Sequence, residues 1–159
     1  MITMVSMRGM ARVVLALAVL GAGSIVGSAT AMATELGDYL WKQRPLLVFA
    51  PSDNDPRLAE TRSRIEASRC GFVDRDMVLG VVVAKGTSTL DGHVIDADES
   101  QQLAKKYGVG ADAFTVLLIG KDGGEKLRTR DVPDLQLIYD LIDGMPMRSN
   151  EMDSDRRQC

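Results

Sequence analysis

The chain has 159 residues, the length of one compact domain with little room for a second. Hydrophobic residues make up 45% and charged residues 26%, which excludes a wholly disordered chain, and the 4% of aromatic residues implies a mainly aliphatic core. The net charge of −3 argues against nucleic acid as a partner, because nucleic acid requires a basic protein surface.

Residues 1–33 have the pattern of a cleavable signal peptide. Arg8 and Arg12 form a positive segment, residues 13–20 (VVLALAVL) form an apolar one, and residues 31–33 (AMA) give an A-x-A cleavage site. The alternative is an uncleaved membrane anchor, but the glycines and serines of the apolar stretch favour cleavage. We therefore expect a periplasmic or secreted protein with no stable membrane insertion after cleavage.

The first half of the mature chain predicts a helix, a strand and a second helix. The amphipathic segment 35–41 predicts a short leading helix, and the apolar run 46–50 (LLVFA) predicts a buried strand. Asp55 and Pro56 are typical of an N-cap and a first helical position. The helix that they begin is expected to end near Gly71.

The second half predicts three strands and two helices. The strands are expected at 77–84, 114–120 and 125–130. Residues 85–95 are irregular and predict a loop or a short extra strand. Asp98 and Gln101 resemble a capping box at the start of a helix that ends at Gly108, and a last helix is expected between Pro133 and Gly144.

This β-α-β-α-β-β-α order predicts an α/β fold. The first two strands should be parallel and the closing hairpin antiparallel, in a mixed four-stranded sheet with helices on both faces. Such a three-layer α/β/α sandwich resembles the thioredoxin-like superfamily. The domain is expected to span residues 34–147, and residues 148–159 to form a flexible polar tail.

Four segments resemble one thioredoxin-like family, that of domain of unknown function 4174. They are Arg44–Ser52 (RPLLVFAPS), Asp74–Asp76 (DRD), Leu118–Arg128 (LIGKDGGEKLR) and Met145–Arg148 (MPMR). The resemblance implies a short exported bacterial protein, related to domains of secreted animal matrix proteins. It carries over no catalytic residues.

The chain departs from working thioredoxins at their active site. Thioredoxins place a C-x-x-C pair where the first strand leads into its helix, because a helix N-terminus lowers the thiol pKa. Residues 54–57 of this chain (NDPR) contain no sulfur, and no proline occurs at residues 113 and 114, where thioredoxins have a cis-proline. This alignment excludes dithiol exchange of the thioredoxin type.

Two charged groups are candidate binding residues. Asp55 and Arg57 lie at the expected helix start, where a helix N-terminus and a guanidinium could hold a small anionic ligand or an acidic group of a protein; the alternative is that Asp55 only caps the helix. Asp74, Arg75 and Asp76 precede the second strand, where they could act in acid/base catalysis, hold a divalent cation or form a structural ion-pair turn.

The remaining reactive residues are few. His93 is the only histidine, which excludes a multi-histidine metal site, and the sequence predicts neither a metal nor a cofactor. Cys70 and Cys159 could form a disulfide or remain free. The catalytic residues are unknown, and we expect a non-catalytic binding or structural module. The alternative is a thiol-dependent redox or antioxidant enzyme that uses Cys70.

Overall fold

The computed structural model describes residues 32–154, so the expected signal peptide and Cys159 lie outside the described residues. In chain order the elements are α1 (Met32–Tyr39), β1 (Arg44–Ser52), α2 (Pro56–Ala67), α3 (Arg69–Asp74), β2 (Met77–Lys85), β3 (Thr89–Leu90), β4 (His93–Val94), α4 (Ala97–Tyr107), β5 (Thr115–Ile119), β6 (Glu125–Thr129), α5 (Leu135–Asp143) and α6 (Pro146–Ser154). Within this part of the chain no helix is long and apolar enough to cross a bilayer.

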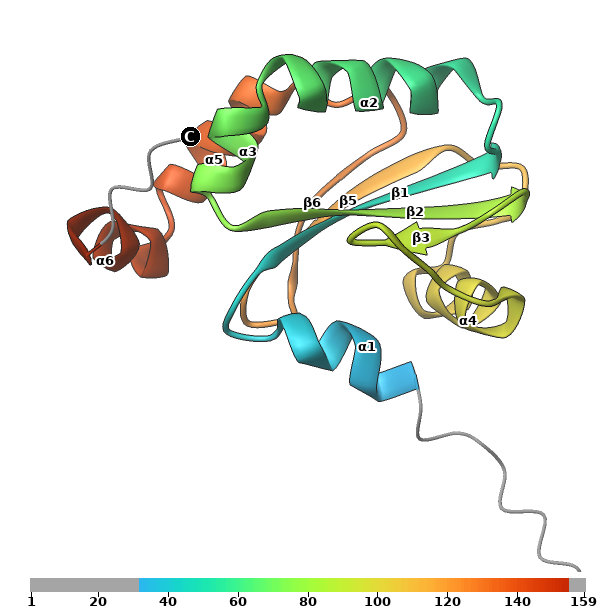
Figure 1. Ribbon diagram of the computed structural model, residues 1–159, viewed down its shortest axis with the longest axis horizontal. Coiled ribbons are helices and arrows are strands. Elements are labelled where there is room, and N and C mark those ends of the chain that lie inside the picture. The colour runs from blue at the N-terminus through green and yellow to red at the C-terminus, as the bar shows by residue number, and fades with distance from the viewer. Residues whose placement is uncertain (1–31, 155–159) are drawn as a thin grey trace, which may run out of the picture.

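One mixed sheet organises the domain, with the strand order β4-β3-β2-β1-β5-β6. The β1 and β2 strands are parallel, and every other pairing is antiparallel. Helices α2, α3 and α5 lie on one side of the sheet, and α1 and α4 lie on the other (Figure 1). The predicted three-layer α/β/α sandwich is therefore confirmed.

The central strand β1 supplies both halves of the core, because alternate side chains of a strand point to opposite faces. Leu46 and Val48 pack in a cluster with the apolar sides of α2, α3 and α5. Leu47 and Phe49 pack in a second cluster with α4. A strand buried on both faces has a continuous apolar sequence, which is why β1 could be recognised from its composition.

The sheet has six strands rather than the predicted four. The two additional strands, β3 and β4, come from the stretch that was expected to contain a loop or a short extra strand. They form a small hairpin that adds to the free edge of β2, where Gly80 pairs with Leu90 and Val81 pairs with Thr89.

Two helix boundaries differ from the prediction. The helix expected to continue to Gly71 ends at Ala67, because the backbone of Ser68 leaves the helical conformation (φ −120°, ψ 30°) and a new short helix follows. The capping box of α4 is formed by Asp96 and Glu99, two residues earlier than the predicted pair.

The C-terminal region contains one more helix than the sequence predicts. The helix α6 spans Pro146–Ser154 and so includes the first residues of the segment 148–159, which was expected to form a flexible tail. The helix is tied to the domain by Arg148, which is only 5% exposed. Charged side chains are usually solvated, so the sequence alone gives no indication that this arginine is buried.

Candidate functional site

The loop after β1 is closed by contacts within the chain. Asp55 is 8% exposed and caps α2 by accepting a hydrogen bond from the backbone N–H of Arg57 at 2.9 Å. Its carboxylate also accepts from the Arg57 guanidinium, at 3.0 Å from Nε and 2.7 Å from Nη2. The hydrogen bond from the Arg57 side chain holds the pKa of Asp55 below its ordinary value.

The guanidinium of Arg57 has a second partner in the chain. It lies over the ring of Phe114, with 4.6 Å between the guanidinium carbon and the ring centroid. The cation–π contact engages one face of the guanidinium, and the two hydrogen bonds to Asp55 engage one of its edges. The site at which thioredoxins keep their cysteines therefore contains a closed Asp55–Arg57–Phe114 cluster.

The other predicted group lies at the far end of the sheet. Asp74 and Asp76 precede β2, whereas Asp55 follows β1. Because β1 and β2 are parallel, the end of one strand and the start of the other lie at opposite edges of the sheet (Figure 1). The structure does not bring the two predicted groups together, and they cannot form one site.

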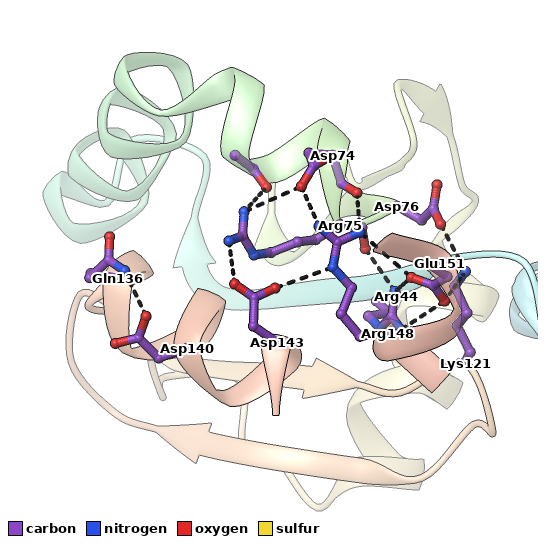
Figure 2. Close-up of polar contacts among 11 residues, drawn as sticks. Arg44, Asp74, Arg75, Asp76, Lys121, Gln136, Asp140, Asp143, Arg148 and Glu151 are labelled. Atoms are coloured by element: carbon purple, nitrogen blue, oxygen red, sulfur yellow. Dashed lines mark hydrogen bonds and ion pairs between the residues drawn. The ribbon is translucent and has the colours of Figure 1, made fainter. Parts of the chain in front are cut away.

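Asp74, Arg75 and Asp76 belong to a larger cluster of charges, the α6 ion-pair cluster, which is drawn in Figure 2. Its members are Arg44, Asp74, Arg75, Asp76, Lys121, Asp143, Arg148 and Glu151. The cluster contains four positive and four negative side chains, so their formal charges sum to zero. The acids of the predicted ion-pair turn do not pair chiefly with the arginine between them, but with side chains from other elements.

Arg148 and Arg75 connect three helices. Arg148 donates to the Asp74 carbonyl at 2.7 Å and to the Asp74 carboxylate, and its Nε donates to Asp143 at 3.2 Å. Arg75 donates to the second oxygen of Asp143 at 2.5 Å and to the Gly71 carbonyl at 2.9 Å. Burial opposes ionisation of Asp143, but the hydrogen bonds from Arg75 and Arg148 outweigh it and lower its pKa.

Glu151 joins the other half of the cluster. The Arg44 guanidinium donates to both Glu151 oxygens at 3.0 Å, and the Lys121 ammonium lies 2.7 Å from Oε1 and 2.8 Å from the Asp76 carboxylate. Burial of Glu151 works against its ionisation, but hydrogen bonds from Arg44 and Lys121 outweigh burial and lower its pKa. The arrangement neutralises two side chains that are almost fully inaccessible to solvent, because Arg44 is 1% exposed and Lys121 is 7% exposed.

A cleft of about 830 Å³ opens at the opposite end of the domain, on the α4 side of the sheet. Phe49, Val82 and Ile95 contribute buried apolar surface, while α4 and the β3–β4 hairpin contribute the walls. Val94, which is 72% exposed, lies at this cleft. We call this cleft the α4 cleft.

The α4 cleft is nearly free of charge. Among the described residues that line it, only Asp98 and Lys105 are charged, and most of the rest are apolar or small. Ala113, one of the two positions that correspond to the thioredoxin proline, lines the cleft, but Asp55 and Arg57 do not. A volume between 300 and 1,000 Å³ with a mainly apolar lining is typical of pockets for small organic ligands.

Cys70 is exposed on α3 and is disulfide-bonded. Its position on a short helix is distant in sequence from the α2 N-terminus, where a helix would lower the pKa of a thiol.

Within residues 32–154 no group of three or more His, Cys, Asp or Glu side chains could hold a metal ion.

Solved structures with a similar fold include a peroxiredoxin and a thioredoxin peroxidase. A Plasmodium vivax 2-Cys peroxiredoxin superposes with a TM-score of 0.54 at 18% identity, over 72% of each chain. A Plasmodium yoelii thioredoxin peroxidase I superposes with a TM-score of 0.50 at 19% identity, over 76% of this chain and 82% of that one. Together with the strand order, these matches define a protein of the thioredoxin fold.

The sequence comparison identifies the family. The profile described as Domain of unknown function (DUF4174) matches residues 35–151, and the chain belongs to this family. A zebrafish (Danio rerio) relative, coiled-coil domain-containing protein 80, is 24% identical over 133 residues, which is 74% of this chain. The chain spans only 15% of the length of that relative.

The α6 ion-pair cluster was only partly found from the sequence. Each of the four segments that carry the family resemblance contributes at least one member to it. These members are Arg44, the stretch Asp74–Asp76, Lys121 and Arg148. The resemblance of these segments to one family gave no indication that their charged side chains meet at one place.

Proposed function

We propose that this protein is an exported binding module that holds a small, largely apolar molecule in the α4 cleft and performs no thiol chemistry. The observation that carries the proposal is the contrast between two neighbouring places. The position of the thioredoxin cysteines is occupied by Asp55, Arg57 and Phe114, which contact one another, whereas a mainly apolar cleft opens beside it.

The lining of the cleft supports a ligand of this class. Burial of apolar surface stabilises a complex by about 25 cal/mol per Å² before the costs of association. The exposed side chains of Gln101 and Gln102 supply a few polar groups that could orient a ligand. The two charges at the cleft, Asp98 and Lys105, have opposite signs and so favour no ionic ligand.

The alternative, a thiol-dependent enzyme that uses Cys70, has less support. A disulfide-bonded cysteine is not a nucleophile until it is reduced. The likeness to peroxiredoxins is below 20% identity and concerns the fold alone. Export, predicted from residues 1–33, is consistent with a stable disulfide because disulfides persist in oxidising compartments.

The proposal can be tested with the uncharged dye Nile red, whose fluorescence rises in apolar surroundings. Ala84, an exposed residue at the end of β2 that lines the cleft, is replaced by tryptophan to fill it. The matched control is Ala59→Trp, at an exposed position of α2 on the other side of the sheet. We expect saturable binding to the wild-type protein and to the control, and loss of binding in Ala84→Trp.

Two results would contradict the proposal. One is an absence of saturable dye binding to the wild-type protein, or equal binding to both tryptophan variants. The other is steady turnover of hydrogen peroxide with a dithiol reductant that disappears in Cys70→Ser, because this would establish the thiol enzyme instead.

A further inference from the structure

The carboxylate of Glu151 occupies a site that the rest of the domain builds. Both of its oxygens accept hydrogen bonds from the two terminal nitrogens of Arg44 at 3.0 Å, and Oε1 also lies 2.7 Å from Lys121. This two-pronged contact is the geometry in which a guanidinium recognises a carboxylate. Arg44 begins β1 and Lys121 follows β5, so neither belongs to α6.

The helix that carries Glu151 is held mainly by charge. Among residues 146–152 of α6, Arg148 is the only buried one, and Met147 and Met152 are 36% and 47% exposed. A helix of nine residues is not stable by itself in water. Because Arg148 is in the first turn, the later turns of α6 depend chiefly on Glu151 for their attachment.

Release of Glu151 would leave an excess of buried positive charge. Arg44 and Lys121 would then face Asp76 as the one remaining carboxylate in direct contact with either of them among the residues described. Arg44 is 1% exposed, and a buried charge that loses its partner is strongly unfavourable. The opened site therefore favours any anion with the shape of the lost carboxylate.

We propose that Arg44 and Lys121 form a carboxylate-binding site that Glu151 occupies within the chain, and that a small external carboxylate displaces the last turns of α6. The site lies at the end of the sheet opposite the α4 cleft, so it is independent of the function proposed above. Binding at this site would be coupled to release of the C-terminal part of α6, because the two carboxylates compete for the same donors.

The test removes the internal carboxylate and supplies an external one. Glu151→Ala leaves a vacancy beside Arg44, and the matched control Glu125→Ala removes a glutamate that pairs with Arg128 on the surface. Thermal unfolding is followed at pH 7 with sodium acetate replacing sodium chloride at constant ionic strength. We expect acetate to raise the Tm of Glu151→Ala saturably by several degrees, and to leave the wild type and the control without such a rise.

The outcomes separate the explanations. An absence of a saturable rise in folded Glu151→Ala, or an equal rise in all three proteins, overturns the proposal. A rise with phosphate but not with acetate overturns the assignment to carboxylates.

A second measurement uses the wild-type protein and does not depend on the folding of the variant. Amide hydrogen exchange at residues 149–152 should become several-fold faster as acetate is raised at constant ionic strength, because acetate competes with Glu151 for Arg44. Exchange at the buried α5 residues Ile138 and Ile142 serves as the internal reference. Exchange in α6 that is indifferent to acetate overturns the displacement of the helix.

Discussion

Replacement of Asp55 by alanine separates its role as a helix cap from a role in binding. The substitution removes the acceptor that lies 2.9 Å from the backbone nitrogen of Arg57 at the start of α2. Loss of an N-cap costs about 1 kcal/mol, with a range of roughly 0.5–2 kcal/mol. The Arg57 side chain is 42% exposed, so water can solvate it once the carboxylate is gone and no buried unpaired charge remains. We expect a loss of about 1–2 kcal/mol.

Urea unfolding followed by circular dichroism measures this loss, with an unchanged m-value. Asp55→Ser is the matched control, because serine keeps a side-chain oxygen at the N-cap and should recover most of the stability. Arg57→Ala keeps the cap and should cost less than Asp55→Ala. If Asp55→Ser is as unstable as Asp55→Ala, or if Asp55→Ala loses nothing, the capping argument is wrong.

Three further results are expected. Lys121→Met should destabilise the fold by about 3 kcal/mol in urea unfolding, because it removes a buried ammonium that lies 2.8 Å from the Asp76 carboxylate and 2.7 Å from the Glu151 carboxylate, whereas Lys126→Met at an exposed pair should cost less than about 1 kcal/mol; equal losses would contradict this. The pKa of Glu151 is lowered in the folded state, so its stabilisation is complete above the ordinary value of 4.5 and is lost as the pH falls through the folded pKa. Amide exchange in α6 should therefore accelerate on acidification before exchange in α5 does, and simultaneous loss of both would argue against a charge-held α6. Cys70 should resist alkylation until a reductant is added, and rapid labelling of the native unreduced protein would contradict the disulfide.

Much of the fold could be predicted because its signals are local. The buried strands β1 and β5 are continuous apolar runs, and Asp55 with Pro56 is a strong helix start. The β3–β4 hairpin could not be located, because strands of two residues have too short a pattern to show a period. The capping box of α4 was displaced by two residues because several acidic residues compete for the N-cap position in that stretch.

The candidate site was less predictable than the fold. That Asp55 and Arg57 lie together follows from their spacing at a helix start. The partners of Asp74 and Asp76 come instead from α6 and from the turn after β5, and ion pairs between distant segments leave no periodic signal in a single sequence. Burial of Arg44 runs against the usual exposure of arginine, and only tertiary packing determines it.

The central claim, that the α4 cleft binds a small apolar molecule without help from the closed thioredoxin position, is tested most directly by two-dimensional NMR of the labelled protein during a Nile red titration. The account predicts amide shift changes at cleft residues such as Val83, Ala84 and Gly110, with Asp55 and Arg57 unaffected. Shift changes centred on Asp55 and Arg57, with the cleft residues unmoved, would contradict it.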